Sequence, residues 1–171
     1  IAFGLTEGYT PLRETLKAYL AKKEGFDFEK NELFIVSGGQ QCADIATKVL
    51  VNEGDTVLTE DPAFVGCLNT FRTYNANLIG IPMEEDGMNI EALKDALETG
   101  QNIKMLYTIP SFQNPTGITT SLEKRKKIYE LCCEYDVAIF EDNPYGELRF
   151  AGDNVPTIKS MDTDTRVHSP C

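Results

Sequence analysis

Four short segments of this sequence carry residues whose types and spacing could do chemistry. The first, Gly38-Gly39-Gln40-Gln41, stands between a strand-like run and a helical pattern. Free backbone N–H groups and the positive end of the helix dipole meet at such a point and favour an anion, for example a phosphate. The fingerprint GxGxxG is missing, and a plain tight turn gives the same pattern. A phosphate site and an ordinary turn therefore both stay open.

A ring and an amide follow two further strand-like runs. Pro62 stiffens the loop before Phe64, whose ring could stack on a flat cofactor, although a phenylalanine here also suits the core. Asn114 lies in Ser111 to Gly117 and precedes a proline, which pushes it toward an extended conformation that could point its amide into a cleft. The alternative for Asn114 is a turn stabilised by its own side chain.

The fourth segment, Glu141-Asp142-Asn143-Pro144-Tyr145-Gly146, places a carboxylate three residues before a phenol, after an apolar strand. An unpaired buried charge is unfavourable, so Asp142 should meet a cationic group, and the protonated ring nitrogen of a cofactor would serve. A helix N-cap and an ordinary ion pair are the two simpler roles for such an aspartate. All three roles stay open on these residues alone.

Alternating strand and helix patterns must position these segments. Thr10 is the expected N-cap of a first helix, with Pro11 at its first position. The sequence predicts helices over 10–25, 43–50, 65–74, 89–99 and 121–135, and strands over 33–36, 56–59, 77–82, 104–109 and 137–140. This order predicts an α/β fold, a mostly parallel sheet with helices on both faces, because parallel neighbours need crossover connections. Ligands then bind beyond the carboxyl ends of the strands, where the four segments lie.

The composition limits the class of protein. The 171 residues are 42% apolar, which suits one compact domain, and the formal charge of −11 disfavours nucleic acid and anionic membranes as partners. No run approaches the about 20 apolar residues of a membrane span, and no secretion signal is visible, so we expect a cytoplasmic protein. Five cysteines show no metal-like CxxC spacing, and we interpret them as reduced thiols. Both ends of the chain look like cuts.

Together and in order, these segments resemble the fold-type I pyridoxal-phosphate aminotransferases of class I/II, especially the branch of 2-aminoadipate and aromatic amino-acid aminotransferases. The resemblance covers nearly the whole chain, residues 1–171, as a cofactor-binding large domain without the small C-terminal domain. The matching stretches are Thr6 to Arg13, Ser37 to Gln41, Asp61 to Gly66, Ser111 to Gly117 and Glu141 to Phe150.

The resemblance implies a role for each matching residue. Gly38, Gly39 and Gln40 would hold the phosphate of pyridoxal 5'-phosphate, and Phe64 stands where a tyrosine usually stacks on the pyridine ring. Asn114 and Tyr145 would donate hydrogen bonds to the phenolic oxygen of the cofactor, and Asp142 would pair with the pyridine nitrogen. The implied substrates are an amino acid and a 2-oxo acid, and the implied assembly is a homodimer.

Two positions depart from the family pattern. Phe3 stands where a tyrosine often reaches the phosphate in the partner subunit. The Schiff-base lysine of the family falls beyond residue 171, and Lys159 is not assigned its role because its surroundings resemble a connecting segment. We therefore expect no catalytic lysine in the chain and no transamination by the chain alone.

Two other functions stay open beside the aminotransferase. An aminotransferase-like domain also serves as the effector module of GntR-type transcription regulators, although no basic helix-turn-helix is visible here. A fold-type I lyase or decarboxylase would use the same ring electronics. The sequence does not separate these reactions, nor does it identify the amino acid.

Overall fold

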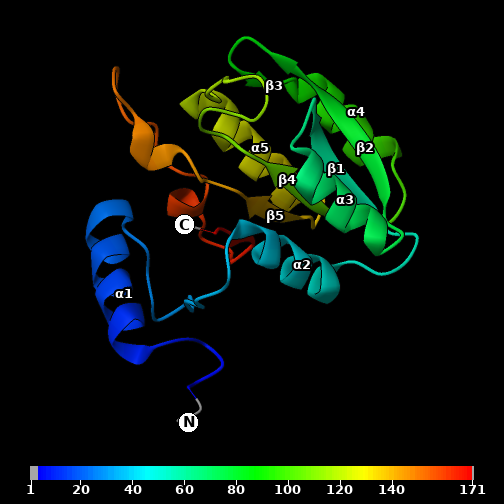
Figure 1. The fold of residues 1–171 in the computed structure, drawn as a ribbon. Helices are drawn as coiled ribbons and strands as arrows, with labels where there is room; N and C mark the ends of the chain where they lie inside the picture. Colours follow the sequence, from blue (N-terminus) through cyan, green and yellow to red (C-terminus); the bar gives the residue numbers. More distant parts are fainter. Residues whose placement is uncertain (1–3, 171) are drawn as a thin grey trace.

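The strands of this protein form one six-stranded sheet in the computed structural model, which describes residues 4–170 (Figure 1). The strand order is β3-β2-β1-β4-β5-β6, and every neighbouring pair is parallel except β2 and β3. The predicted α/β fold with a mostly parallel sheet is therefore confirmed. The strands are β1 (Thr56–Asp61), β2 (Asn77–Glu84), β3 (Gly87–Met88), β4 (Ile103–Thr108), β5 (Ala138–Glu141) and β6 (Val167–His168).

Helices cover both faces of this sheet. In Figure 1, α2 and α3 lie over one face and α4 and α5 over the other. Asn89 and Ser121 cap α4 and α5, since their side chains accept hydrogen bonds from the backbone N–H groups of Ala92 and Lys124. The helices are α1 (Thr10–Glu24), α2 (Gly39–Leu50), α3 (Val65–Thr73), α4 (Ile90–Thr99) and α5 (Leu122–Glu134), with short 3-10 turns at Gly146–Leu148 and Lys159–Met161.

The central strands are buried on both faces. Side chains alternate along a strand, so successive residues of β1, β4 and β5 enter different cores, which explains why these strands read as continuous apolar runs. The strand residues are Leu58, Leu106 and Ile139 in the core under α4 and α5, and Val57, Met105 and Phe140 in the core under α2 and α3.

Two local predictions are wrong. Tyr9, not Thr10, is the N-cap of α1, and it makes no side-chain capping bond; Thr10 is the first helical residue. The strand predicted at 33–36 does not form, although the run is apolar. Its backbone makes one backbone–backbone hydrogen bond among the described residues, from the Ile35 N–H to the Glu7 carbonyl at 2.9 Å, whereas a strand needs a row of such bonds to a neighbouring strand.

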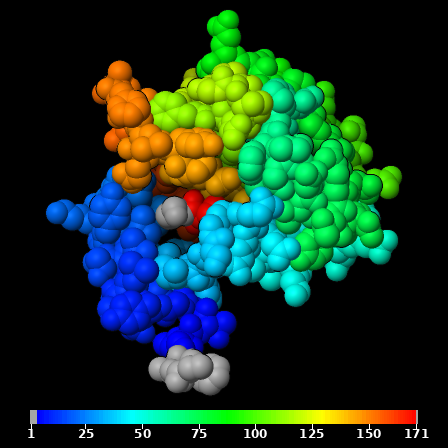
Figure 2. Space-filling model, in the orientation of Figure 1, coloured from blue at the N-terminus to red at the C-terminus, as the bar shows by residue number. Residues whose placement is uncertain are grey.

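Helix α1 lies beside the sheet layers rather than on them (Figure 1). Figure 2 shows a hollow between the N-terminal part (blue) and the sheet-bearing part, with C-terminal residues (red) at its floor. Leu20 is the buried residue of α1, whereas Tyr9 is 72% exposed and Tyr19 48% exposed. Hydrogen bonds from Arg13 to the Leu33 carbonyl and to Glu32 connect α1 to the segment that follows it.

Within residues 4–170, no helix is long and apolar enough to cross a membrane. Cys42, Cys67, Cys132 and Cys133 are free thiols, as expected, and Cys171 lies outside the described residues. Burial raises the pKa of Cys67 to about 11 and that of Cys132 to about 12, which keeps both thiols protonated.

Candidate functional site

Three of the four predicted segments begin where neighbouring parallel strands end. Strands β1, β4 and β5 are adjacent, and they end at Asp61, Thr108 and Glu141. Since parallel strands finish at the same edge, the loops that carry Phe64, Asn114 and Asp142 share one side of the sheet. This is the edge where the sequence predicted the site.

The glycine segment begins helix α2 beside this edge. Gly38 has φ 81°, a left-handed conformation that glycine adopts without strain, and its carbonyl accepts from the N–H groups of Gln41 and Cys42. The N–H groups of Gly39 and Gln40 belong to the first turn, which has no intrahelical acceptors for them. A Cβ atom at Gly38 would meet nothing within 4 Å, and one at Gly39 would meet only the Asp142 Oδ1 atom, at 3.9 Å. The helix start is therefore open toward Asp142.

The side chain of Gln40 connects helices α2 and α3. Its Nε2 donates to the Gly66 carbonyl at 3.1 Å and to the Thr70 hydroxyl. The ring of Phe64 also lies against Gly66, because a Cβ atom there would come within 2.5 Å of the ring. Phe64 is partly buried against the core under α2 and α3, so its core role and a ligand-stacking role are compatible. Gln40 can offer a ligand its backbone N–H.

Asn114 and Tyr145 come together from different loops. The Asn114 Nδ2 atom donates to the Tyr145 hydroxyl at 3.3 Å, across 31 residues of sequence. The turn that contains Asn114 is stabilised instead by Gln113, whose side-chain oxygen accepts from the N–H and hydroxyl of Thr116 at 2.9 and 2.7 Å. The alternative reading of Asn114 as the stabiliser of its own turn is therefore wrong.

Asp142 follows β5 as a partly buried carboxylate with a neutral partner. The Tyr107 hydroxyl donates to its Oδ2 atom at 3.1 Å, and no ion pair within residues 4–170 includes it. Burial raises the pKa of Asp142, and the Tyr107 hydrogen bond acts in the opposite direction. Asp142 is neither a helix N-cap nor half of an ion pair, so both simpler roles are wrong, and its charge lacks a cationic partner among these residues.

The sequence reasoning missed three residues that support the site. Tyr107 is fully buried on β4 and holds Asp142, while burial and the Asp142 charge raise its pKa far above the usual range. Glu60 and Gln113, each 1% exposed, bond to one another at 2.9 Å between Oε2 and Nε2. The sequence feature that could have identified them is a polar residue within or just after an apolar strand, because a polar side chain that is buried there needs a hydrogen-bond partner.

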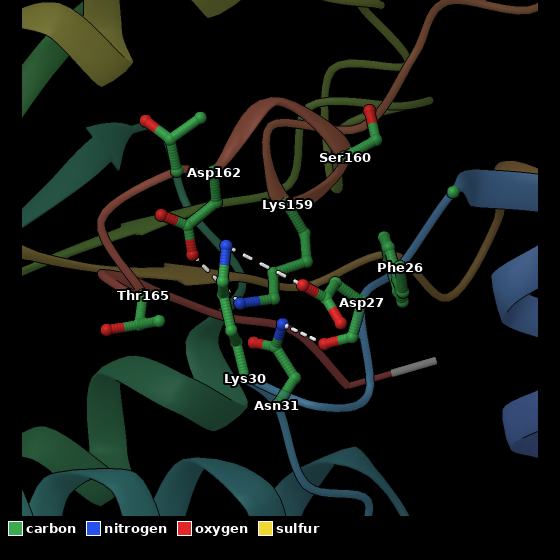
Figure 3. A pocket seen from close by; sticks show the side chains of 10 residues that line it. Phe26, Asp27, Lys30, Asn31, Lys159, Ser160, Asp162 and Thr165 are labelled. Carbon is green, nitrogen blue, oxygen red and sulfur yellow. Dashed lines mark hydrogen bonds and ion pairs between the residues drawn. The ribbon is translucent and has the colours of Figure 1, made fainter.

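Lys159 forms an ion pair outside the predicted cofactor site. Figure 3 shows it in a small pocket between the residues after α1 and the 3-10 turn at Lys159–Met161. Its Nζ atom lies 2.8 Å from Oδ2 of Asp162, a carboxylate whose side chain is fully buried. The pocket is lined by residues from 25–31 and 159–165, and none of the seven predicted cofactor residues is among them. This agrees with leaving Lys159 without a catalytic role.

The residues present fit pyridoxal phosphate. The open helix start suits a phosphate, the Asn114 and Tyr145 pair supplies donors, and the unpaired Asp142 suits a protonated ring nitrogen. Phe3, where the family often has a phosphate-binding tyrosine, lies outside the described residues.

Comparisons with known proteins find similarity over nearly the whole chain. The family model for aminotransferase class I and II matches residues 2–169. Aromatic-amino-acid aminotransferase 1 of Thermococcus litoralis is 38% identical over 171 residues, which is 98% of this chain and 41% of that relative. The crystal structure of Pyrococcus horikoshii kynurenine aminotransferase in complex with PMP has a TM-score of 0.94 at 40% identity, covering 99% of this chain and 43% of that one.

A regulator is also similar to this chain. The probable rhizopine catabolism regulatory protein MocR of Rhizobium meliloti is 30% identical over 160 residues, which is 94% of this chain and 31% of that relative. The chain thus spans well under half the length of each of these relatives.

Proposed function

The chain belongs to the class I and II aminotransferases, and from this we propose that residues 1–171 form a cofactor-binding large domain that works in pyridoxal-phosphate-dependent amino transfer. The observation that carries the proposal is the unpaired Asp142 carboxylate, which faces an open helix start beside the Asn114 and Tyr145 pair. The substrates in this proposal are an amino acid and a 2-oxo acid, and the assembly is a homodimer.

The phosphate end of the cofactor is assigned to the start of α2. The N–H groups of Gly39 and Gln40 donate to the phosphate oxygens, and the left-handed Gly38 lets the backbone turn toward them. The helix dipole adds a favourable interaction of about 0.3–1 kcal/mol with a nearby negative charge. Phe64 contributes its ring face, which needs no hydroxyl for stacking.

The ring of the cofactor is assigned to three polar groups. Asn114 and Tyr145 donate hydrogen bonds to its phenolic oxygen, and Asp142 keeps a proton on its nitrogen. When bound, pyridoxal phosphate supplies a protonated aromatic ring that accepts the electron pair left when an amino acid loses its α-proton. Tyr107 keeps the Asp142 carboxylate oriented and favours its ionised form.

Covalent attachment is not assigned to any lysine of this chain. Lys159 is paired with Asp162, and the resemblance leads us to expect the Schiff-base lysine of the family beyond residue 171. We therefore propose that the 171-residue chain binds the cofactor without a covalent bond and does not turn over substrate alone. Steady amino transfer to 2-oxoglutarate by the pure chain would refute the second statement.

An absorbance titration of the pure chain with pyridoxal phosphate tests the function. Borohydride reduction and intact mass should follow, with Asp142→Ala as the variant and exposed Asp153→Ala as the matched control. We expect saturable binding in the wild type and in the control, loss of binding in Asp142→Ala, and no stoichiometric reduced adduct. Absence of binding in the wild type would contradict the proposal, and a stoichiometric adduct would show that a lysine has been misjudged.

The similarity to MocR supports a second candidate, a domain that binds a ligand for regulation without catalysis. A chimera separates the two functions: this chain joined to the C-terminal remainder of the Thermococcus litoralis relative, at the end of the matched region. Amino transfer by the chimera favours the enzyme. Cofactor binding without turnover, in a chimera that folds, favours the regulatory domain.

A further inference from the structure

Two of the site loops are connected by one buried carboxylate that the function above does not use. Glu60 lies near the end of β1 and is 1% exposed. Its Oε1 atom accepts from the Thr108 hydroxyl at 2.6 Å and from the Ile109 N–H at 3.1 Å. Its Oε2 atom accepts from Nε2 of Gln113 at 2.9 Å. These three hydrogen bonds hold the buried carboxylate in one position, because the loss of any of them would leave a buried polar group without a partner.

Gln113 extends this connection to both loops. Its Nε2 atom also donates to the Pro62 carbonyl at 2.7 Å, and Pro62 stands two residues before Phe64. Its Oε1 atom accepts from the N–H and hydroxyl of Thr116, which closes the turn around Asn114. Both ends of the Gln113 amide are therefore used, and its orientation is determined by the acceptors Glu60 and Pro62 on one side and the donors of Thr116 on the other.

We propose that Glu60 is a positioning residue that, through Gln113, sets the loop of Phe64 and the loop of Asn114 relative to one another so that both residues meet the same ligand. The proposal rests on the cofactor site proposed above. Within residues 4–170, neither Phe64 nor Asn114 makes a hydrogen bond to the other loop, whereas Gln113 bonds to Pro62 in one loop and to Thr116 in the other. Glu60 acts through these bonds and touches no reacting atom.

The charged form of Glu60 is the one that fits these bonds. Burial raises its pKa to about 7, while Thr108, Gln113 and the Ile109 N–H act in the opposite direction. In Glu60→Gln, the new amide must turn its NH₂ group either toward the Gln113 NH₂ group or toward Thr108 and the Ile109 N–H. Either orientation sets donors against donors, so the substitution disturbs the connection at nearly constant volume.

Glu141 offers a matched control. It is also a fully buried carboxylate at the end of a parallel strand, and it accepts from the N–H groups of Ile158 and Lys159 at 2.8 and 2.7 Å. Glu141→Gln should therefore lower stability in the same manner without contact to the loops of Phe64 and Asn114. A difference between the two variants isolates positioning from a general loss of stability.

Two measurements on the 171-residue chain test the proposal. Amide hydrogen exchange of the free chain should be at least about tenfold faster at 62–66 and 113–118 in Glu60→Gln, and near wild type there in Glu141→Gln. Pyridoxal-phosphate affinity should fall at least about tenfold in Glu60→Gln. Equal effects of the two variants on exchange at 62–66 and 113–118, or no effect of Glu60→Gln there, would overturn the proposal.

Two further outcomes are covered by the design. If Glu60→Gln does not fold, Thr108→Val is the alternative variant, because it removes only the 2.6 Å bond to Glu60. It should increase amide exchange in the same two stretches by a smaller factor. Amide exchange equal to that of the wild type would overturn the proposal. If the wild type binds no pyridoxal phosphate, the function proposed above fails. The exchange measurement still decides the positioning role, because it needs no ligand.

Discussion

Replacing Asp142 by asparagine should make the chain without cofactor more stable at neutral pH and should weaken cofactor binding. Asparagine has the same shape, and its side-chain oxygen can still accept the Tyr107 hydrogen bond, so the substitution removes the charge. A carboxylate charge is more costly to bury than a neutral amide of the same shape, and the Tyr107 hydrogen bond is present in both side chains, so the two differ by the burial of the charge. The free energy of unfolding should therefore rise by about 1 kcal/mol, a Tm increase of about 2–4 °C in a chain of this size.

The sign of the pH dependence follows from the pKa of Asp142. Burial raises this pKa in the folded chain, so the folded chain binds the proton more tightly than the unfolded chain. Above the folded-state pKa, the Asp142 charge destabilises the wild type. This destabilisation decreases as the pH falls from the folded-state pKa toward the lower pKa of the unfolded chain, because the carboxyl then takes up a proton. The advantage of Asp142→Asn should therefore be present near about pH 7.5 and shrink toward about pH 3.5.

Urea unfolding at the two pH values measures the stability difference, and a pyridoxal-phosphate titration measures the affinity. Loss of a charge-assisted hydrogen bond should weaken binding by about 10- to 100-fold. Exposed Asp153→Asn is the control and should change neither quantity. If Asp142→Asn were less stable than the wild type at neutral pH, or differed equally at both pH values, Asp142 would already have a stabilising partner. Such a result would refute the inference that Asp142 lacks a cationic partner until a ligand binds.

Three other substitutions test the roles of Tyr107, Arg125 and Lys159. Tyr107→Phe removes the hydroxyl that donates to Asp142 and should raise the pKa of that carboxyl further, as followed by ¹³C NMR; an unchanged titration would contradict the role of Tyr107. Arg125 is fully buried and donates to backbone carbonyls of two loops, so Arg125→Met should lower the free energy of unfolding by about 3 kcal/mol or more in urea. Lys159→Met should leave the cofactor titration unchanged but lower stability by about 1–3 kcal/mol, since buried Asp162 loses its cationic partner. Loss of cofactor binding would instead place Lys159 in the site.

The sequence by itself determined the helices, most strands and the position of the site segments along the chain. These follow from local regularities: the apolar period of α4 and α5 with caps at Asn89 and Ser121, and the apolar runs that became β1 and β4. The seven cofactor residues were named from motifs and remain a proposal. The placement of Phe64, Asn114, Asp142 and Tyr145 at one edge follows from the parallel sheet, because parallel strands end together; the glycine segment follows no strand among residues 4–170.

Only the tertiary structure decided which side chains support those residues. The bonds from Tyr107 to Asp142 and from Gln113 to Glu60 join positions 35 and 53 residues apart, and they exist because β1, β4 and β5 are neighbours in the sheet. The order of the strands in the sheet cannot be deduced from the apolar pattern of any one strand, because it depends on how the crossover connections place the strands. The same reason explains the failed strand at 33–36, whose apolar pattern was sufficient in sequence but found no adjacent strand in space.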